Sequence, residues 1–128
     1  MHIQMIGIDF QRADIAQREP VSFTRHQVLQ LLPILRGGTH VLACALLATC
    51  NRTELYLHTA QPIDGLQLLA DAAGFPAEQY RALAAERQGE QAVRHIMAVA
   101  AGLQSQIFGD DQIVTQVRTA LDLANQAE

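Results

Sequence analysis

The chain has 128 residues, a formal net charge of −4, and 49% hydrophobic and 17% charged residues. This length suits one domain, and this balance of apolar and charged residues excludes a disordered chain. The mild negative charge excludes a broad phosphate-binding face, so any contact with RNA should be local. No apolar run approaches the roughly eighteen residues of a membrane span, and residues 1–11 lack the pattern of a signal peptide. We therefore expect a cytoplasmic protein that does not bind a membrane.

The first predicted elements are a strand and a helix. Residues 3–9 are mostly apolar and predict a strand. Thr24 is a suitable N-cap for the helix that follows, and Gln27, three residues later, completes a capping box. The apolar residues of this helix repeat at helical spacing: Val28, Leu31, Leu32 and Leu35. Pro33 is expected to kink the helix or split its last turn, and the two glycines at 37–38 end it.

Two apolar segments then flank a polar one. Residues 41–47 are continuously apolar, which is typical of a buried strand. In residues 54–59, Leu55 and Leu57 alternate with polar neighbours, which predicts a half-buried strand. Cys50 therefore lies where a strand ends.

Cys50 is a candidate nucleophile. The N–H groups of a turn and the nearby Arg52 both favour the thiolate form, so we expect the pKa of the Cys50 thiol to lie below its reference value of about 8.5. The alternative is an inert buried cysteine, and Cys44, inside the apolar run, fits that description well. A disulfide between the two is not expected, because six residues of extended strand separate them by roughly 20 Å.

The second half of the chain predicts mainly helices. A short helix over residues 66–73 is bracketed by Asp64 before it and a glycine and a proline after it. Residues 80–87 are ambiguous between helix and strand. A helix begins at Glu90, and a further helical pattern restarts at Ile113 on a new face.

Several polar residues on these helices have two possible roles. On the helix that begins at Glu90, His95 is either a catalytic residue or a hydrogen-bonded structural histidine. Gln112 and Gln116, one turn apart, are either solvated surface or part of a site. The histidines and cysteines form no cluster with ligand spacing, so we expect no metal.

Three blocks of this chain resemble the glutamyl-tRNA reductase family. The most specific is Thr49-Cys50-Asn51-Arg52-Thr53-Glu54-Leu55-Tyr56. A second block comprises residues 92–96, 99–105 and 109–118 in the family's order and spacing, and residues 7–23 are similar to a first block. Together they cover nearly the whole of residues 1–128 and resemble the amino-terminal catalytic domain alone.

The resemblance implies a fold and a site. The fold is an α+β domain, a single domain with a mainly antiparallel sheet and helices packed on it, in which residues 80–87 form a strand. Cys50 and His95 are implied as catalytic residues. The residues implied to bind the glutamyl group are Thr49, Asn51, Arg52, Ser105, Asp110, Asp111, Gln112 and Gln116. Charge supports Arg52 independently, because a guanidinium group is well suited to a substrate carboxylate.

The implied reaction is the reduction of glutamyl-tRNA to glutamate-1-semialdehyde for tetrapyrrole biosynthesis. The Cys50 thiolate attacks the ester carbonyl and forms a thioester, which NADPH then reduces. The chain contains no glycine-rich dinucleotide motif, so we expect it to carry only the acylation step. In the family an NADPH-binding domain and a dimerisation domain follow the catalytic domain, and we expect both to be absent from this chain.

The implied partners are glutamyl-tRNA, a second subunit in a homodimer of the full-length enzyme, and glutamate-1-semialdehyde aminomutase, the next enzyme. A different class of function stays open: a non-catalytic module that binds a glutamyl-like ligand or a pathway partner. The loop at residues 10–14 favours this alternative, because it departs from the family's usual His-Lys-Thr-Ala-Pro. Another alternative is a thiol hydrolase of activated esters. The thiol at Cys50, kept together with Arg52 and His95, favours the reductase.

Overall fold

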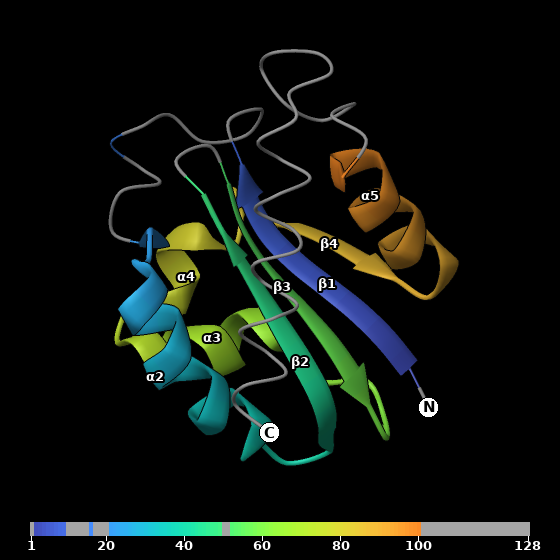
Figure 1. Cartoon of the computed structure of the whole chain (residues 1–128), viewed down its shortest axis with the longest axis horizontal. Coiled ribbons are helices and arrows are strands. Elements are labelled where there is room, and N and C mark those ends of the chain that lie inside the picture. Colours follow the sequence, from blue (N-terminus) through green and yellow to red (C-terminus); the bar gives the residue numbers. More distant parts are fainter. Residues whose placement is uncertain (1, 10–15, 17–20, 50–51, 101–128) are drawn as a thin grey trace.

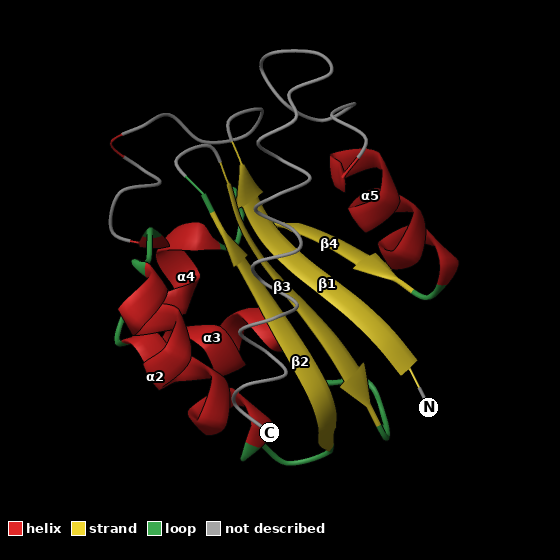
Figure 2. Cartoon of the chain, in the orientation of Figure 1, coloured by secondary structure: helices red, strands yellow, loops and turns green. Residues whose placement is uncertain are grey.

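The computed structural model describes residues 2–9, 16, 21–49 and 52–100 of the chain. The strands within these ranges are β1 (His2–Asp9), β2 (Val41–Ala48), β3 (Arg52–Thr59) and β4 (Ala85–Gln88). The helices are α2 (Arg25–Arg36), α3 (Gly65–Ala73), α4 (Ala77–Tyr80) and α5 (Glu90–Ala100). Figure 1 shows their arrangement, and Figure 2 separates helices from strands by colour.

The four strands form one antiparallel sheet in the order β2-β3-β1-β4. β2 and β3 are consecutive in the chain and pair directly, whereas β1 is inserted between β3 and β4 (Figure 1). The register places Met5 of β1 opposite Tyr56 of β3 on one side and opposite Arg87 of β4 on the other. The predicted fold class, an α+β domain with a mainly antiparallel sheet, is confirmed.

One face of the sheet carries the main hydrophobic core. Alternate residues of β1 and β3, such as Ile6 and Leu57, share one buried cluster with residues of α2, α3 and α4, which lie together in Figure 1. In this layer α2 packs on β2, and α3 packs on β1 and β3. The helices contribute their apolar stripes, and Leu32 and Leu35 of α2 are fully buried. Burial of this kind contributes about 1.5–3 kcal/mol per large aliphatic side chain, so this layer stabilises the sheet.

The helix ends follow the local sequence. Thr24 caps α2 in a capping box with Gln27, as predicted. α2 continues through Pro33 to Arg36, so the proline does not split it. α3 begins after its N-cap Asp64, as predicted, and ends at Gly74, which has the left-handed φ of 82° that glycine adopts without strain.

α5 covers the opposite face of the sheet. It packs against β1 and β4, and its residue His95 contacts Glu54 of β3. Because successive side chains of a strand point to opposite faces, Glu54 lies on the face away from Leu55 and the main core. The sheet is therefore covered on both faces in the region of β1 and β3.

Two local predictions need correction. The segment 54–59 was expected to form a half-buried strand, but β3 is buried on both faces along most of its length. The strand expected over residues 80–87 is shorter, because α4 ends at Tyr80 and β4 begins at Ala85. Within the described ranges, no helix has the length and apolar character needed to cross a membrane.

Candidate functional site

Hydrogen bonds join Thr49 and Arg52, the residues on either side of positions 50–51 at the end of the β2–β3 hairpin. The Thr49 N–H donates to the Arg52 carbonyl oxygen at 2.9 Å, and the Arg52 N–H donates to the Thr49 hydroxyl oxygen at 3.1 Å. Cys50 and Asn51 themselves lie outside the described residues. The predicted nucleophile is therefore joined by a single residue to Arg52, whose backbone position is fixed.

A buried carboxylate lies two residues further along β3. Glu54 is 1% exposed and makes three side-chain hydrogen bonds, with Arg52, Tyr56 and His95. Its Oε2 accepts from Nη1 of Arg52 at 3.5 Å and lies 2.5 Å from Nε2 of His95. Its Oε1 accepts from the Tyr56 hydroxyl at 2.9 Å. The buried carboxylate is thus surrounded by a positive charge and by hydrogen-bonding groups, which a buried ion requires.

His95 is held by this carboxylate. Its side chain is buried on the inner face of α5, next to Val99 one turn later. Nε2 of His95 faces Oε2 of Glu54, so Nδ1 is the ring nitrogen that Glu54 does not engage. Glu54 therefore sets the orientation of the ring.

Gly7 makes room for Glu54. Gly7 of β1 lies opposite Glu54 in the antiparallel register. A Cβ at Gly7 would lie 2.9 Å from Cγ of Glu54 and 3.2 Å from Sδ of Met5, both closer than carbon and sulfur atoms normally approach. Glycine at this position is therefore part of the site, because a larger residue would displace the carboxylate.

Tyr56 acts as a hydrogen-bond donor in this group. Burial raises the pKa of Tyr56 well above its usual range, and the adjacent charge of Glu54 raises it further. The phenol consequently stays protonated at every physiological pH and donates to Glu54. We refer to Arg52, Glu54, Tyr56 and His95 as the Glu54 cluster.

The Glu54 cluster contains two predicted site residues and two that sequence reasoning missed. Arg52 and His95 were predicted, and the structure brings both to one carboxylate. Glu54 and Tyr56 were not singled out, although alternation along β3 places them on the same face as Arg52. Thr49, which was also predicted, is described and bonds to Arg52 at the hairpin end. The other predicted positions lie outside the described residues: Cys50, Asn51, Ser105, Asp110, Asp111, Gln112 and Gln116.

Cys44 is the inert cysteine that was expected. Its side chain is buried in the main core, with Sγ 3.9 Å from the Leu32 carbonyl oxygen. Burial raises the pKa of the Cys44 thiol to about 11, although Arg36 acts in the opposite direction. At neutral pH Cys44 is therefore a thiol and not a nucleophile.

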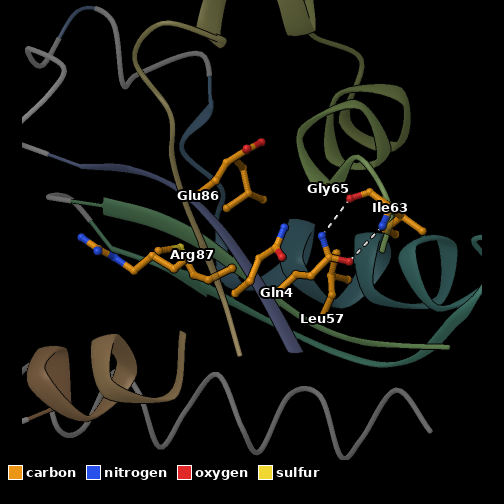
Figure 3. Close-up of a pocket in the computed structure, with 9 residues that line it drawn as sticks. Gln4, Leu57, Ile63, Gly65, Glu86 and Arg87 are labelled. Carbon is orange, nitrogen blue, oxygen red and sulfur yellow. Dashed lines mark hydrogen bonds between the residues drawn. The ribbon is translucent and has the colours of Figure 1, made fainter. Parts of the chain in front are cut away.

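Two pockets near the sheet differ in what they can hold. The pocket in Figure 3 has a volume of about 50 Å³ and lies on the core side of β1 and β4. Gln4 closes it, because its side chain donates to the Ile63 carbonyl oxygen at 2.8 Å and accepts from the Ile63 N–H at 3.0 Å. This pocket has room for water and too little for a glutamyl group.

The second pocket is a groove of about 350 Å³ beside α5, and His95 forms part of its wall. Its lining residues are Arg87, Gln91, Arg94, His95 and Ala98. The groove therefore connects the Glu54 cluster with the surface of the protein. Among the described residues, no group of three or more histidine, cysteine, aspartate or glutamate side chains is arranged to hold a metal ion.

Comparisons with known proteins identify the family and the fold of the chain. Residues 6–128 match the family model described as Glutamyl-tRNAGlu reductase, N-terminal domain. The chain is 40% identical over 128 residues to glutamyl-tRNA reductase of Acetivibrio thermocellus, covering 98% of this chain and 39% of that protein. It is 41% identical over 124 residues to glutamyl-tRNA reductase of Pseudomonas aeruginosa, covering 95% of this chain and 29% of that protein.

A solved structure is similar over the same range. Glutamyl-tRNA reductase from Methanopyrus kandleri superimposes with a TM-score of 0.78 at 27% sequence identity, covering 98% of this chain and 28% of that one. This chain thus spans two fifths or less of the length of each of these proteins.

Proposed function

The chain belongs to the family of the N-terminal domain of glutamyl-tRNAGlu reductase, and on that premise we propose that it carries the acylation step of glutamyl-tRNA reduction in tetrapyrrole biosynthesis. The observation that supports this most directly is the Glu54 cluster. It gathers a buried arginine and an oriented histidine next to the hairpin end that carries Cys50 in the sequence.

In the proposed step, the Cys50 thiolate attacks the ester carbonyl carbon that joins glutamate to the terminal ribose of the tRNA. A carbon–sulfur bond forms and the carbon–oxygen bond to the ribose breaks. The ribose oxygen leaves as an alcohol after taking up one proton, and the glutamyl group stays on Cys50 as a thioester. A thioester accepts hydride more readily than a carboxylate, which explains the use of a thiol.

We assign the proton transfer to His95. Its Nε2 is engaged with Glu54, so Nδ1 is the ring nitrogen that takes the proton of the Cys50 thiol as the thiolate forms and then donates that proton to the leaving ribose oxygen. Glu54 acts through His95 and through Arg52 and is a positioning residue. Because Glu54 is also bonded to Tyr56, its carboxylate cannot rotate freely and holds the ring in one orientation.

The glutamyl group carries one free carboxylate, on its side chain, and we assign its recognition to Arg52 together with the polar residues near the hairpin end. A guanidinium group presents donors in a fork that fits a carboxylate. The further residues proposed to line this pocket are Thr49, Asn51, Ser105, Asp110, Asp111, Gln112 and Gln116. The ion pair with Glu54 holds the Arg52 guanidinium in place when no substrate is bound.

The described residues do not fit NADPH, the hydride donor of the complete reaction. The sheet is antiparallel, and no glycine-rich turn of the dinucleotide-binding type follows any of the described strands. We therefore derive no reduction step from this chain. In the full-length relatives, binding of the dinucleotide and dimerisation are proposed to belong to the parts of the protein that this chain does not span.

The proposal is tested by the release of tRNA. Glutamyl-tRNA is incubated with an excess of the chain, and deacylated tRNA is followed on an acid gel for the native protein, Cys50→Ser and the matched control Cys44→Ser. Release is expected to be fast with the native chain and with Cys44→Ser, and to fall to the uncatalysed rate with Cys50→Ser.

Two other results would contradict the proposal. Binding of glutamyl-tRNA without any release would indicate the non-catalytic module. Many rounds of release per chain, without a covalent intermediate, would indicate a hydrolase of activated esters. Addition of NADPH is expected to change neither the rate nor the amount of tRNA released by this chain.

A further inference from the structure

The groove beside α5 is lined almost entirely by hydrogen-bond donors. It is formed by Arg87 of β4 together with Gln91, Arg94 and His95 of α5, and it has a volume of about 350 Å³. No carboxylate is among its described lining residues. Its two arginines give the groove local positive charge on a chain whose formal net charge is −4, and Glu90 pairs with one of them, Arg94.

Arg87 has donor capacity that the described residues do not use. Its Nε atom is buried and has no hydrogen-bond partner among them. A buried donor without an acceptor is unfavourable, so such an atom commonly marks a place where a water, an ion or a ligand binds. Figure 3 shows the Arg87 side chain extending from β4 in the direction opposite to that of Gln4 and the small pocket.

The groove is continuous with the Glu54 cluster. His95 belongs to both, and Arg87, Met5 and Tyr56 form one row across β4, β1 and β3. Burial and Glu54 raise the pKa of Tyr56, whereas the guanidinium groups of Arg52 and Arg87 act in the opposite direction, as expected for cations near the phenol. An anion held by Arg87 would therefore lie next to the proposed reaction centre.

We propose that this groove binds the phosphates at the 3′ end of the tRNA, a deduction that rests on the proposed function. The ester to be attacked is on the terminal ribose, and the phosphate closest to it is attached to that same ribose. A phosphate only accepts hydrogen bonds, and arginine is the side chain best suited to it. Arg94 reinforces the outer part of the groove. Its ion pair with Glu90 is 76% exposed on both sides, so this pair is weak and exchanges readily for a phosphate.

The binding test uses an RNA hairpin that carries the acceptor stem and the single-stranded CCA end, labelled with fluorescein. Its dissociation constant is measured over a series of salt concentrations for the native chain, Arg87→Gln and Arg94→Gln. Arg25→Gln is the matched control, because Arg25 is exposed at the start of α2 on the other side of the sheet.

Each of the two groove variants is expected to bind about threefold to tenfold more weakly at moderate salt. Each should also reduce the slope of log Kd against log salt by about 0.7, the value for one contact to a single-stranded phosphate. Arg25→Gln should bind as the native chain does. Unchanged affinity and slope in both groove variants would overturn the assignment, as would an equal loss in the control.

A second substrate separates this inference from the proposed function. Acylation of Cys50 by an α-thioester of glutamate with a small thiol involves no phosphate, so Arg94→Gln should leave its rate unchanged. The same variant should raise the concentration of glutamyl-tRNA at which the acylation rate is half-maximal. If Arg94→Gln lost acylation by both glutamyl-tRNA and the small thioester, the groove assignment would be overturned. If the native chain is acylated by neither substrate, the proposed function fails, and the RNA-binding measurement still decides the role of the groove. Displacement of the RNA by millimolar NADPH would also overturn it, in favour of a dinucleotide.

Discussion

Replacement of Glu54 by glutamine tests the electrostatic core of the candidate site. Glutamine keeps the shape of the side chain and removes its charge. Its amide can turn its oxygen toward His95 and Arg52 and its NH₂ toward the Tyr56 hydroxyl, which then accepts instead of donating. Hydrogen bonds are thus largely retained, and the main loss is the negative charge that faces the buried guanidinium of Arg52.

The size of this loss follows from burial. Both Arg52 and Glu54 are 1% exposed, so solvent does little to replace the missing charge. Removal of one member of a buried ion pair costs about 3–5 kcal/mol, and the retained hydrogen bonds place Glu54→Gln at the lower end, about 3 kcal/mol. With a typical urea dependence of about 2 kcal/mol per molar, the unfolding midpoint should fall by about 1.5 M.

Equilibrium unfolding in urea, followed by circular dichroism, measures this shift. Glu86→Gln is the matched control, since Glu86 is an exposed strand residue of β4 whose replacement should change the free energy of unfolding by less than about 0.5 kcal/mol. A midpoint for Glu54→Gln as close to the native value as that of the control would refute the view that Glu54 compensates a buried charge.

Three further predictions concern neighbouring groups. Gly7→Ala should lower the free energy of unfolding by about 1–3 kcal/mol in the same urea assay, because the new Cβ would lie 2.9 Å from Cγ of Glu54; an unchanged midpoint would show that the sheet yields at no cost. Cys50 should be alkylated at pH 8 far faster than Cys44, because a pKa of about 11 keeps Cys44 a thiol until the solution is strongly alkaline. Peptide mass analysis after timed labelling checks this. Equal labelling of the two cysteines would remove the nucleophile assignment. Arg52→Lys should slow acylation by glutamyl-tRNA by about tenfold to more than a hundredfold, the equivalent of a lost carboxylate contact of about 1.5–3 kcal/mol; an unchanged rate in folded protein would exclude Arg52 from the substrate pocket.

The local elements of the fold were predictable because their signals are local. The capping box of Thr24 and Gln27 and the left-handed Gly74 each depend on a few neighbouring residues, and both helix ends are found where these signals stand. Residues 80–87 were harder, because alanine-rich sequence suits both a helical turn and a short strand. Pairing with β1 decides that β4 begins only at Ala85.

The candidate site was predictable only in part. Arg52 and His95 stand out by residue type and by resemblance, but their meeting at Glu54 depends on α5 covering the second face of β3. That contact joins residues 41 positions apart, and alternation along β3 alone indicated a solvent-facing glutamate. The sequence did contain one signal for this contact: Glu54 lies on the same strand face as Arg52, and buried charges usually occur in oppositely charged pairs.

Whether Cys50 accepts the glutamyl group is decided most directly by mass analysis of the chain after a short incubation with glutamyl-tRNA, quenched in acid to preserve thioesters and digested with a protease. The glutamyl adduct is expected on the peptide that contains Cys50, in an amount equal to the tRNA released at early times. It should be absent from Cys50→Ser and unaffected by NADPH. Released tRNA without an adduct on Cys50, or formation of an aldehyde by this chain with NADPH, would contradict the assignment of the acylation step alone to this domain.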